Sequence, residues 1–343
     1  MIHYLPSNIA LQYSELLPLC ATPLPSGSNL SFKKKTIRGK HYWYLYISLG
    51  SRRTEHYLGE ESAATLALME SEQALWEQHP DDRILRSKLV AMLVAGGATA
   101  LGAEEGKVLA LLEKSGVFLA GGVLVGTHAF QAYANMLGVQ WSNHARTQDI
   151  DLAREIRLPI ALPTASLDVT LKDSLLESGM GFLEVPTLNR KAPSTSFRIR
   201  GKALSVDLLT PMVGSHSAPV PIPGLGAYAE PMRYIEYLLE ETQLAVLLYR
   251  HGILVHLPNP ARYALHKLVT SQRRPSAFAT KSSKDIAQAN ALLEVLCQDR
   301  PGDVILAHEA ALNMGKKFLP ALESAIAQLD EPVRNLLKEA LSP

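Results

Sequence analysis

The segment TQDIDLA, residues 147–153, places two carboxylates one residue apart in an apolar run that is typical of a β-strand. Side chains alternate along a strand, so Asp149 and Asp151 share one face while Ile150 and Leu152 share the other. The apolar pair can face a core, but two carboxylates a few ångströms apart raise each other's pKa unless a cation neutralises them. The segment therefore predicts a strand that carries a cation site beside the core.

A third acid stands in SVDLLTP, a second apolar run with strand character, at Asp207. Three carboxylates on neighbouring strands supply the oxygen ligands that Mg²⁺ or Mn²⁺ prefers, and Mg²⁺ completes its shell with water and phosphate oxygens. We therefore expect Asp149, Asp151 and Asp207 to be metal ligands and catalytic residues, holding two ions ~3.5–4 Å apart.

A phosphate site is predicted in VLVGTHAFQAY, where a strand turns directly into a helix at Gly126 and Thr127. The first turn of a helix offers free N–H groups and the positive end of the helix dipole, both of which attract phosphate. Gly121 and Gly122 offer a second possible turn. A lone Asp-x-Asp or Gly-Thr pair is common, and the prediction depends on all three motifs occurring in this order.

Bulk composition describes an ordinary soluble protein and excludes several classes. The chain has 34 basic and 33 acidic residues, so whole-chain charge does not favour nucleic-acid binding. The two cysteines lack disulfide-framework or zinc spacing, which favours a reducing, cytoplasmic setting. The N-terminus lacks a signal-peptide pattern, and the most apolar segment is too short to span a bilayer, so no membrane association is expected.

The pattern along the chain predicts an α+β protein with a small mixed sheet flanked by helices. We expect a tether and basic β-meander over residues 1–60, with an irregular segment to about residue 30, and a helical linker over 61–115. A catalytic core follows over 116–231, in which PVPIPGLGAYAEP is expected to be a loop. A helical domain is expected over 232–343.

Two stretches are locally basic. The predicted meander, from Phe32 to Glu60, holds seven Lys or Arg and two acids, a local charge of +5, with aromatic residues interleaved. Residues 262–284 hold six Lys or Arg and no acid. Either stretch could bind RNA or DNA. The alternative is that the aromatic side chains are core residues and the cations are only solvated, and both interpretations stay open.

Taken together, GGVLVGTHAFQAYANMLG, RTQDIDLA and VDLL resemble the DNA polymerase β-like nucleotidyltransferase superfamily over about residues 116–300. They are most similar to a bacterial branch that resembles the abortive-infection nucleotidyltransferases, whose Arg-containing segment before the acids is matched at Arg146. The resemblance implies that an NTP binds with its phosphates near the glycine turn and over the metals. It adds nucleotide-binding candidates in PARYALHKLV and KSSKDIAQA, namely Lys267, Lys284 and Asp285. The long gap between Thr127 and Asp149 leaves open which glycine pair forms the phosphate turn.

The function expected from these observations is transfer of an NMP from an NTP to a hydroxyl of RNA, with tRNA one candidate, or of a protein, with release of pyrophosphate. One alternative is a noncatalytic protein of the same fold that binds nucleotide or nucleic acid. Another is a toxin or phage-defence effector built on that fold. Motif spacing does not distinguish these biological roles.

Overall fold

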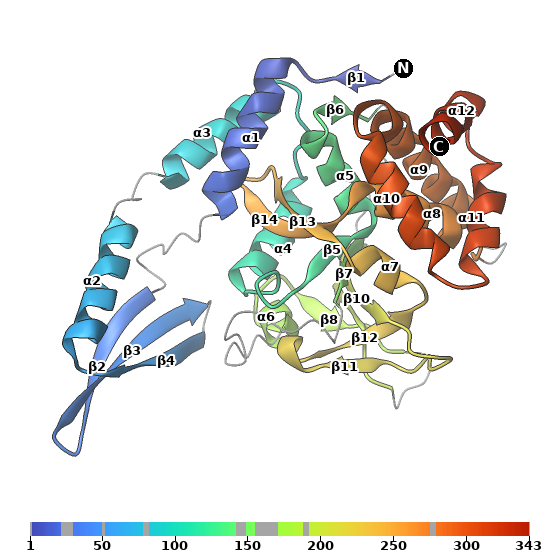
Figure 1. Cartoon of the computed structure of the whole chain (residues 1–343). Coiled ribbons are helices and arrows are strands. Elements are labelled where there is room, and N and C mark those ends of the chain that lie inside the picture. The colour runs from blue at the N-terminus through green and yellow to red at the C-terminus, as the bar shows by residue number, and fades with distance from the viewer. Residues whose placement is uncertain are drawn as a thin grey trace.

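The computed structural model describes residues 2–21, 30–49, 52–77, 82–141, 149–154, 171–187, 192–274 and 279–342. Its largest part is a nine-stranded sheet with helices against it (Figure 1), so the predicted α+β class is confirmed. The strand order is β11-β12-β10-β7-β5-β14-β13, with β9 also on β10 and β8 on β9. The bounds of these strands are β5 Val123–Val125, β7 Asp149–Ala153, β8 Phe182–Glu184, β9 Ser196–Ile199, β10 Ser205–Pro211, β11 Val220–Ile222, β12 Ala227–Met232, β13 Thr242–Leu247 and β14 Ile253–Pro258.

The sheet is mixed, as the sequence predicts. Strand β10 is parallel to both β7 and β12, whereas β5 is antiparallel to β7. On β7 the apolar side chains of Ile150 and Leu152 are buried, and those of the alternating Asp149 and Asp151 are half-buried on the other face. The expected strand alternation around the acids is therefore confirmed.

Helices surround this sheet, and those after β14 gather at one end of the molecule (Figure 1). Helix α5 starts at Gly126, directly after the last residue of β5. Helix α8 is capped at its N-terminus by Asn259, whose side chain accepts hydrogen bonds from the N–H groups of Ala261 and Arg262. The bounds are α4 Ala103–Lys114, α5 Gly126–Met136, α6 Leu171–Leu176, α7 Ile235–Leu239, α8 Pro260–Ser271, α9 Ala279–Asp299, α10 Pro301–Leu312, α11 Phe318–Ile326 and α12 Glu331–Ala340.

The expectation of an irregular segment before residue 30 is wrong for Ser7–Ala21, which forms helix α1. Its buried residues Ile9, Tyr13, Leu16 and Cys20 recur every three or four positions, the spacing of one helix face. This face packs against α3, Asp82–Ala95, and against β13. A short pair of strands, β1 His3–Tyr4 and β6 Val139–Gln140, also holds the N-terminal residues.

Two further expectations about local structure are corrected. The segment PVPIPGLGAYAEP is not only loop, because it contains β11, a 3₁₀ turn at Pro223–Leu225 and part of β12. The residues after Met232 are not helical throughout, because β13 and β14 return to the main sheet as an antiparallel pair. Tertiary pairing decides both, since short apolar runs of this length fit either a strand or a helix.

The expected meander forms a separate sheet of three antiparallel strands, β2 Leu30–Ile37, β3 Lys40–Leu49 and β4 Arg52–Glu60. Arg38 and Gly39 make the first turn with φ values of 52° and 78°, as a tight hairpin turn requires. This sheet and the following helix α2, Ala63–Glu77, lie away from the nine-stranded sheet (Figure 1). In the described part of the chain, each helix is too short or too polar to cross a membrane.

Candidate functional site

The three predicted acids lie on two adjacent parallel strands. In the register of β7 and β10, Asp151 is opposite Asp207 and Asp149 is opposite Ser205. The Ser205 Oγ atom is 2.9 Å from Asp149 Oδ1 and 3.1 Å from Asp207 Oδ2. A hydroxyl has one proton, so Ser205 donates to one of these carboxylates at a time. The structure therefore brings all three acids together at one face of the sheet.

Asp151 is the acid whose pKa is most affected by this arrangement. Burial raises the pKa of its carboxyl to about 6, the nearby charge of Asp207 adds to the increase, and the positive charges of Lys267 and Lys281 oppose it. A cation bound at this carboxylate would stabilise its charged form. The electrostatics of the site thus favour a positive ligand.

The glycine turn at the end of β5 lies directly against these acids. Gly126 has φ +65°, and a Cβ atom added there would collide with Oδ2 of Asp151. Its carbonyl oxygen accepts a hydrogen bond of 2.7 Å from Tyr263, which joins the start of α5 to α8. Glycine is needed both for this backbone conformation and for the close approach of the carboxylate.

The two candidate glycine turns lie at opposite ends of β5. Gly126 and Thr127 line the pocket that contains the acids, whereas Gly121 and Gly122 precede the strand. Three strand residues separate the turns by ~10 Å. Gly126 and Thr127 are thus the pair beside the acids. Thr127 is buried, and the start of α5 has no side-chain cap.

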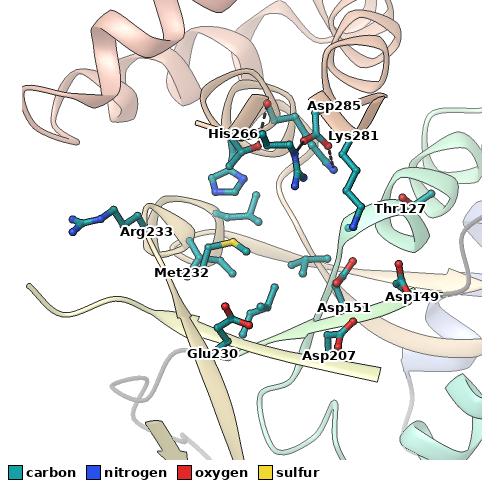
Figure 2. A pocket seen from close by; sticks show the side chains of 18 of the residues that line it. Thr127, Asp149, Asp151, Asp207, Glu230, Met232, Arg233, His266, Lys281 and Asp285 are labelled. Atoms are coloured by element: carbon teal, nitrogen blue, oxygen red, sulfur yellow. Dashed lines mark hydrogen bonds and ion pairs between the residues drawn. The ribbon is translucent and has the colours of Figure 1, made fainter. Parts of the chain in front are cut away.

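Cations from α8 and α9 face the acids across the pocket. Lys267, Lys281 and Lys284 line it together with Arg273 and Arg274. Figure 2 shows Lys281 extending from α9 toward Asp151 and Thr127. Burial lowers the pKa of Lys284, and the neighbouring charge of Lys267 lowers it further.

Asp285, a nucleotide-binding candidate, lies in the wall of the same pocket. Its buried carboxylate forms ion pairs with Lys267 Nζ at 2.7 Å and with Arg274 Nε at 2.6 Å. Lys267 also lies over the ring of Tyr263, 5.4 Å from its centroid. Asp285 therefore fixes two cations of the pocket wall, and a direct contact between Asp285 and nucleotide stays a prediction.

The pocket has a volume of about 820 Å³ and lies between the sheet and the C-terminal helices. Figure 2 shows the acids at one end and Arg233 at the other, with Glu230 and Met232 between them. Two histidines near the acids fit the structural role that isolated histidines usually have. His128 is buried with Nδ1 3.2 Å from the carbonyl oxygen of Asp149, and burial lowers the pKa of His266, which lines the pocket, to about 4. Arg146 falls outside the described residues.

Several site residues are missed by sequence reasoning. Lys281 lies three and four residues before Lys284 and Asp285 on α9, so helical spacing was a usable signal. Ser205 lies two residues before Asp207 on the same strand face, which period-2 alternation would have indicated. Glu230, on β12, and Arg233, in the turn after it, line the pocket because β12 pairs with β10. That long-range pairing has no local sequence signal.

The donor chemistry of the site fits a hard divalent cation, because three carboxylates lie together beside the start of helix α5. Among the described residues, no set of three or more His, Cys, Asp or Glu side chains is arranged as a ready-made metal site. Ser205 lies within hydrogen-bond distance of two of the carboxylates instead. Metal binding at this site would therefore involve a change in which oxygen atoms Ser205 contacts.

A comparison with protein-family models finds a match to the family described as Nucleotidyltransferase over residues 103–313, more than half of the chain. This range contains the three acids, the Gly126 turn and the cations of α8 and α9. Searches of curated proteins and of solved structures find no match.

Proposed function

The chain belongs to the nucleotidyltransferase family, and we propose that it transfers an NMP from an NTP to an acceptor hydroxyl in a divalent-metal-dependent reaction. The observation that carries the proposal is the meeting of Asp149, Asp151 and Asp207 beside the Gly126 helix start, across one pocket from a wall of cations. A triphosphate needs both sides of such a pocket: metal-binding oxygens near the reacting phosphorus and positive groups around the remaining charge.

The positions of the cations in the pocket support one orientation of the bound NTP, with its outer phosphates toward the lysines. Lys281 and Lys284, on α9, with Lys267 held by Asp285, would bind the β- and γ-phosphates together with the N–H groups at the start of α5. The α-phosphate would then lie over the acids. Leaving pyrophosphate carries most of the developing charge, and this wall would stabilise it.

The carboxylates would act on the acceptor. Attack forms a bond between the acceptor oxygen and the α-phosphorus and breaks the bond to the bridging oxygen of pyrophosphate. Asp207, at the side of the acid group toward β9 and β12, would receive the acceptor proton. Mg²⁺ or Mn²⁺, held by Asp149, Asp151 and Asp207, would supply charge neutralisation at the reacting phosphate when bound.

The acceptor that we propose is a hydroxyl of RNA, with a protein hydroxyl as the alternative. Exposed Arg233 and Arg273 line the pocket toward its far end, and Arg273 lies over Tyr234, 5.3 Å from the ring centroid. Cations beside an aromatic ring suit the phosphodiester backbone of an RNA end.

The proposal is tested by incubating the protein with each α-labelled NTP, Mg²⁺ or Mn²⁺, and total cellular RNA or protein. We expect label to enter one acceptor pool and to be lost on addition of a chelator. Asp149→Ala and Asp151→Ala should each lower the initial rate at least ~100-fold, because each removes a carboxylate at the reacting phosphate.

The matched control is Glu323→Gln, which removes an exposed carboxylate on α11 and should leave the rate unchanged. Folding of every variant is checked by thermal unfolding. Absence of labelled product with every NTP and acceptor pool, from a folded protein that still binds NTP, would contradict transfer and support the noncatalytic binding function.

A further inference from the structure

Tyr263 lies buried where three helices of the molecule meet. It belongs to α8, and its hydroxyl lies 2.7 Å from the carbonyl oxygen of Gly126, on α5, and 3.3 Å from Oε1 of Gln288, on α9. Burial raises the pKa of this hydroxyl well above its ordinary value, so the hydroxyl keeps its proton. A hydroxyl has one proton to donate, and the shorter distance favours Gly126 as the acceptor.

The aromatic ring of Tyr263 is fixed by its neighbours. It packs edge-on against Tyr133, with centroids 5.2 Å apart, and the hydroxyl of Tyr133 donates to the carbonyl oxygen of Pro258 at 2.9 Å. Lys267 Nζ lies 5.4 Å from the centroid of the Tyr263 ring and is paired with Asp285 at 2.7 Å. Tyr263 therefore contacts both the glycine turn at the start of α5 and one cation of the pocket wall.

The hydrogen bond to Gly126 also acts on the next N–H group of the chain. The carbonyl of Gly126 and the N–H of Thr127 belong to one planar peptide and point in opposite directions. That N–H is among the first of α5, which have no partner within the helix. Both residues line the pocket, and Figure 2 shows Lys281 extending toward Thr127. The bond from Tyr263 therefore helps to fix where this N–H points, and it strengthens the N–H as a donor by polarising the peptide.

Glycine makes this support from α8 more important. Gly126 has φ +65° and no Cβ atom, so its own sterics restrict the backbone less than those of another residue would. A donor that is already oriented in the free protein loses less conformational freedom when a ligand binds, which increases affinity. A hydrogen bond that holds the peptide after Gly126 is therefore expected to affect binding at the start of α5.

We propose that Tyr263 is a positioning residue for the triphosphate, acting through the peptide between Gly126 and Thr127 on an N–H that binds a phosphate oxygen. The buried hydroxyl itself does not contact the ligand, because it is bonded inside the protein. This inference rests on the proposed function, in which the start of α5 binds the β- and γ-phosphates.

The first test measures binding of inorganic triphosphate with Mg²⁺ to the full-length protein by calorimetry. This probe has no base or sugar, so its affinity reports on the phosphate groups only, and no acceptor is needed. Tyr263→Phe removes the hydroxyl and keeps the ring beneath Lys267. We expect this variant to bind inorganic triphosphate about fivefold or more weakly than the unchanged protein, because one donor to a charged group is no longer held in place.

The matched control is Tyr237→Phe, on α7. Tyr237 is buried, its hydroxyl donates to the carbonyl oxygen of Ala307 at 2.7 Å, and Arg262 lies over its ring, 5.1 Å from the centroid. It is not among the described residues that line the pocket. Both variants lose one buried hydrogen bond to a backbone carbonyl, so thermal unfolding should show similar losses of stability. Tyr237→Phe should change the affinity for inorganic triphosphate less than twofold.

The second test observes the peptide itself by NMR. Gly126-Thr127 is the only Gly-Thr step in the sequence, so glycine labelled with ¹³C at the carbonyl and threonine labelled with ¹⁵N give one carbonyl-to-amide signal. Tyr263→Phe should shift the carbonyl resonance, because the carbonyl loses a hydrogen bond that polarises it. It should also reduce the change that inorganic triphosphate causes in the Thr127 amide signal. Tyr237→Phe should keep both.

The outcomes separate this inference from the proposed function. Equal affinity of Tyr263→Phe and the unchanged protein, equal weakening by Tyr263→Phe and Tyr237→Phe, or an unaltered Thr127 response in Tyr263→Phe would overturn the positioning role and leave the proposed function standing. Absence of triphosphate binding by the unchanged, folded protein would overturn both. Weaker binding in Tyr263→Phe together with a failed transfer assay would support the positioning role in a protein that binds nucleotide without transferring it.

Discussion

Gly126 shows how much of the candidate site depends on a single missing side chain. Its backbone adopts φ +65°, and its Cα hydrogen faces the Oδ2 atom of Asp151. The absence of a Cβ atom lets the carboxylate lie beside the first turn of α5, where the helix dipole is positive. The carboxylate of Asp151 and the turn at the start of α5 can therefore lie next to each other.

We predict that Gly126→Ala lowers the free energy of unfolding by more than the ~1 kcal/mol that alanine costs at a left-handed position, because its Cβ also displaces Asp151. The matched control is Gly214→Ala. Gly214 has φ +62° with open space around its Cβ position, so only the backbone cost applies. Urea unfolding of both variants gives the difference, and equal losses would show that Asp151 moves aside freely.

Helix α1 illustrates an element whose stability comes from packing. Leu16 is fully buried among the residues that α1, α3 and β13 contribute, whereas Leu11 on the same helix is 62% exposed. Most of the stability of a helix of this length comes from its buried face rather than from the propensity of its residues. Substitution of each leucine by alanine therefore changes helix propensity equally, but only substitution of Leu16 also removes packing.

We therefore predict that Leu16→Ala lowers the free energy of unfolding by ~2–5 kcal/mol, while Leu11→Ala changes it by no more than ~0.5 kcal/mol. Denaturant unfolding followed by circular dichroism measures both. Similar small effects would mean that α1 is docked only weakly on the sheet.

At the element scale, sequence reasoning succeeded where one strand or one turn carries its own pattern. The alternation in DIDLA places Asp149 and Asp151 on one face without knowledge of any neighbour. The β5–α5 turn at Gly126 and the three strands of the meander likewise have local signals. These features are fixed by periodicity and by residues that tolerate unusual backbone angles.

Features that depend on pairing at a distance could not be derived in this way. Nothing near Glu230 indicates that β12 lies parallel to β10, which brings this acid to the pocket of Asp207. Helix α1 was missed because its Pro and Gly neighbours dominated the local pattern, although its buried residues keep helical spacing. The ion pairs of Asp285 with Lys267 and Arg274 likewise depend on how α8 and the residues after it pack against α9, which no local pattern indicates.

At the scale of the whole molecule, the stability of the fold should depend on pH through His266. Burial lowers the pKa of this imidazole to about 4, and its Nε2 atom has no hydrogen-bond partner in the described part of the chain. The folded protein therefore holds His266 neutral, whereas the unfolded chain takes up a proton near pH ~6.5. Between these values the unfolded state binds more protons.

Proton uptake by the unfolded state therefore lowers the free energy of unfolding as the pH falls from ~6.5 toward 4. The loss that His266 causes is at most ~3 kcal/mol, and the full stability is present above pH ~6.5. Urea unfolding at a series of pH values should show this decline, and His266→Gln should make it shallower. His216→Gln, at an exposed histidine, is the control and should keep the decline of the original protein. An unchanged pH profile in His266→Gln would assign the decline to other groups.

The hydroxyl of Tyr13 has a consequence for how copies of this protein behave toward one another. Strand β13 lies at the edge of the nine-stranded sheet, and this hydroxyl accepts from the N–H of Val246 at 2.9 Å and lies 3.3 Å from its carbonyl oxygen. An uncovered edge strand is a template on which further chains add, and α1 occupies that template here. Removal of α1 from the N-terminus would uncover the edge of β13. We therefore expect the shortened protein to form fibrous or insoluble material, although the pocket with the three acids keeps all its residues.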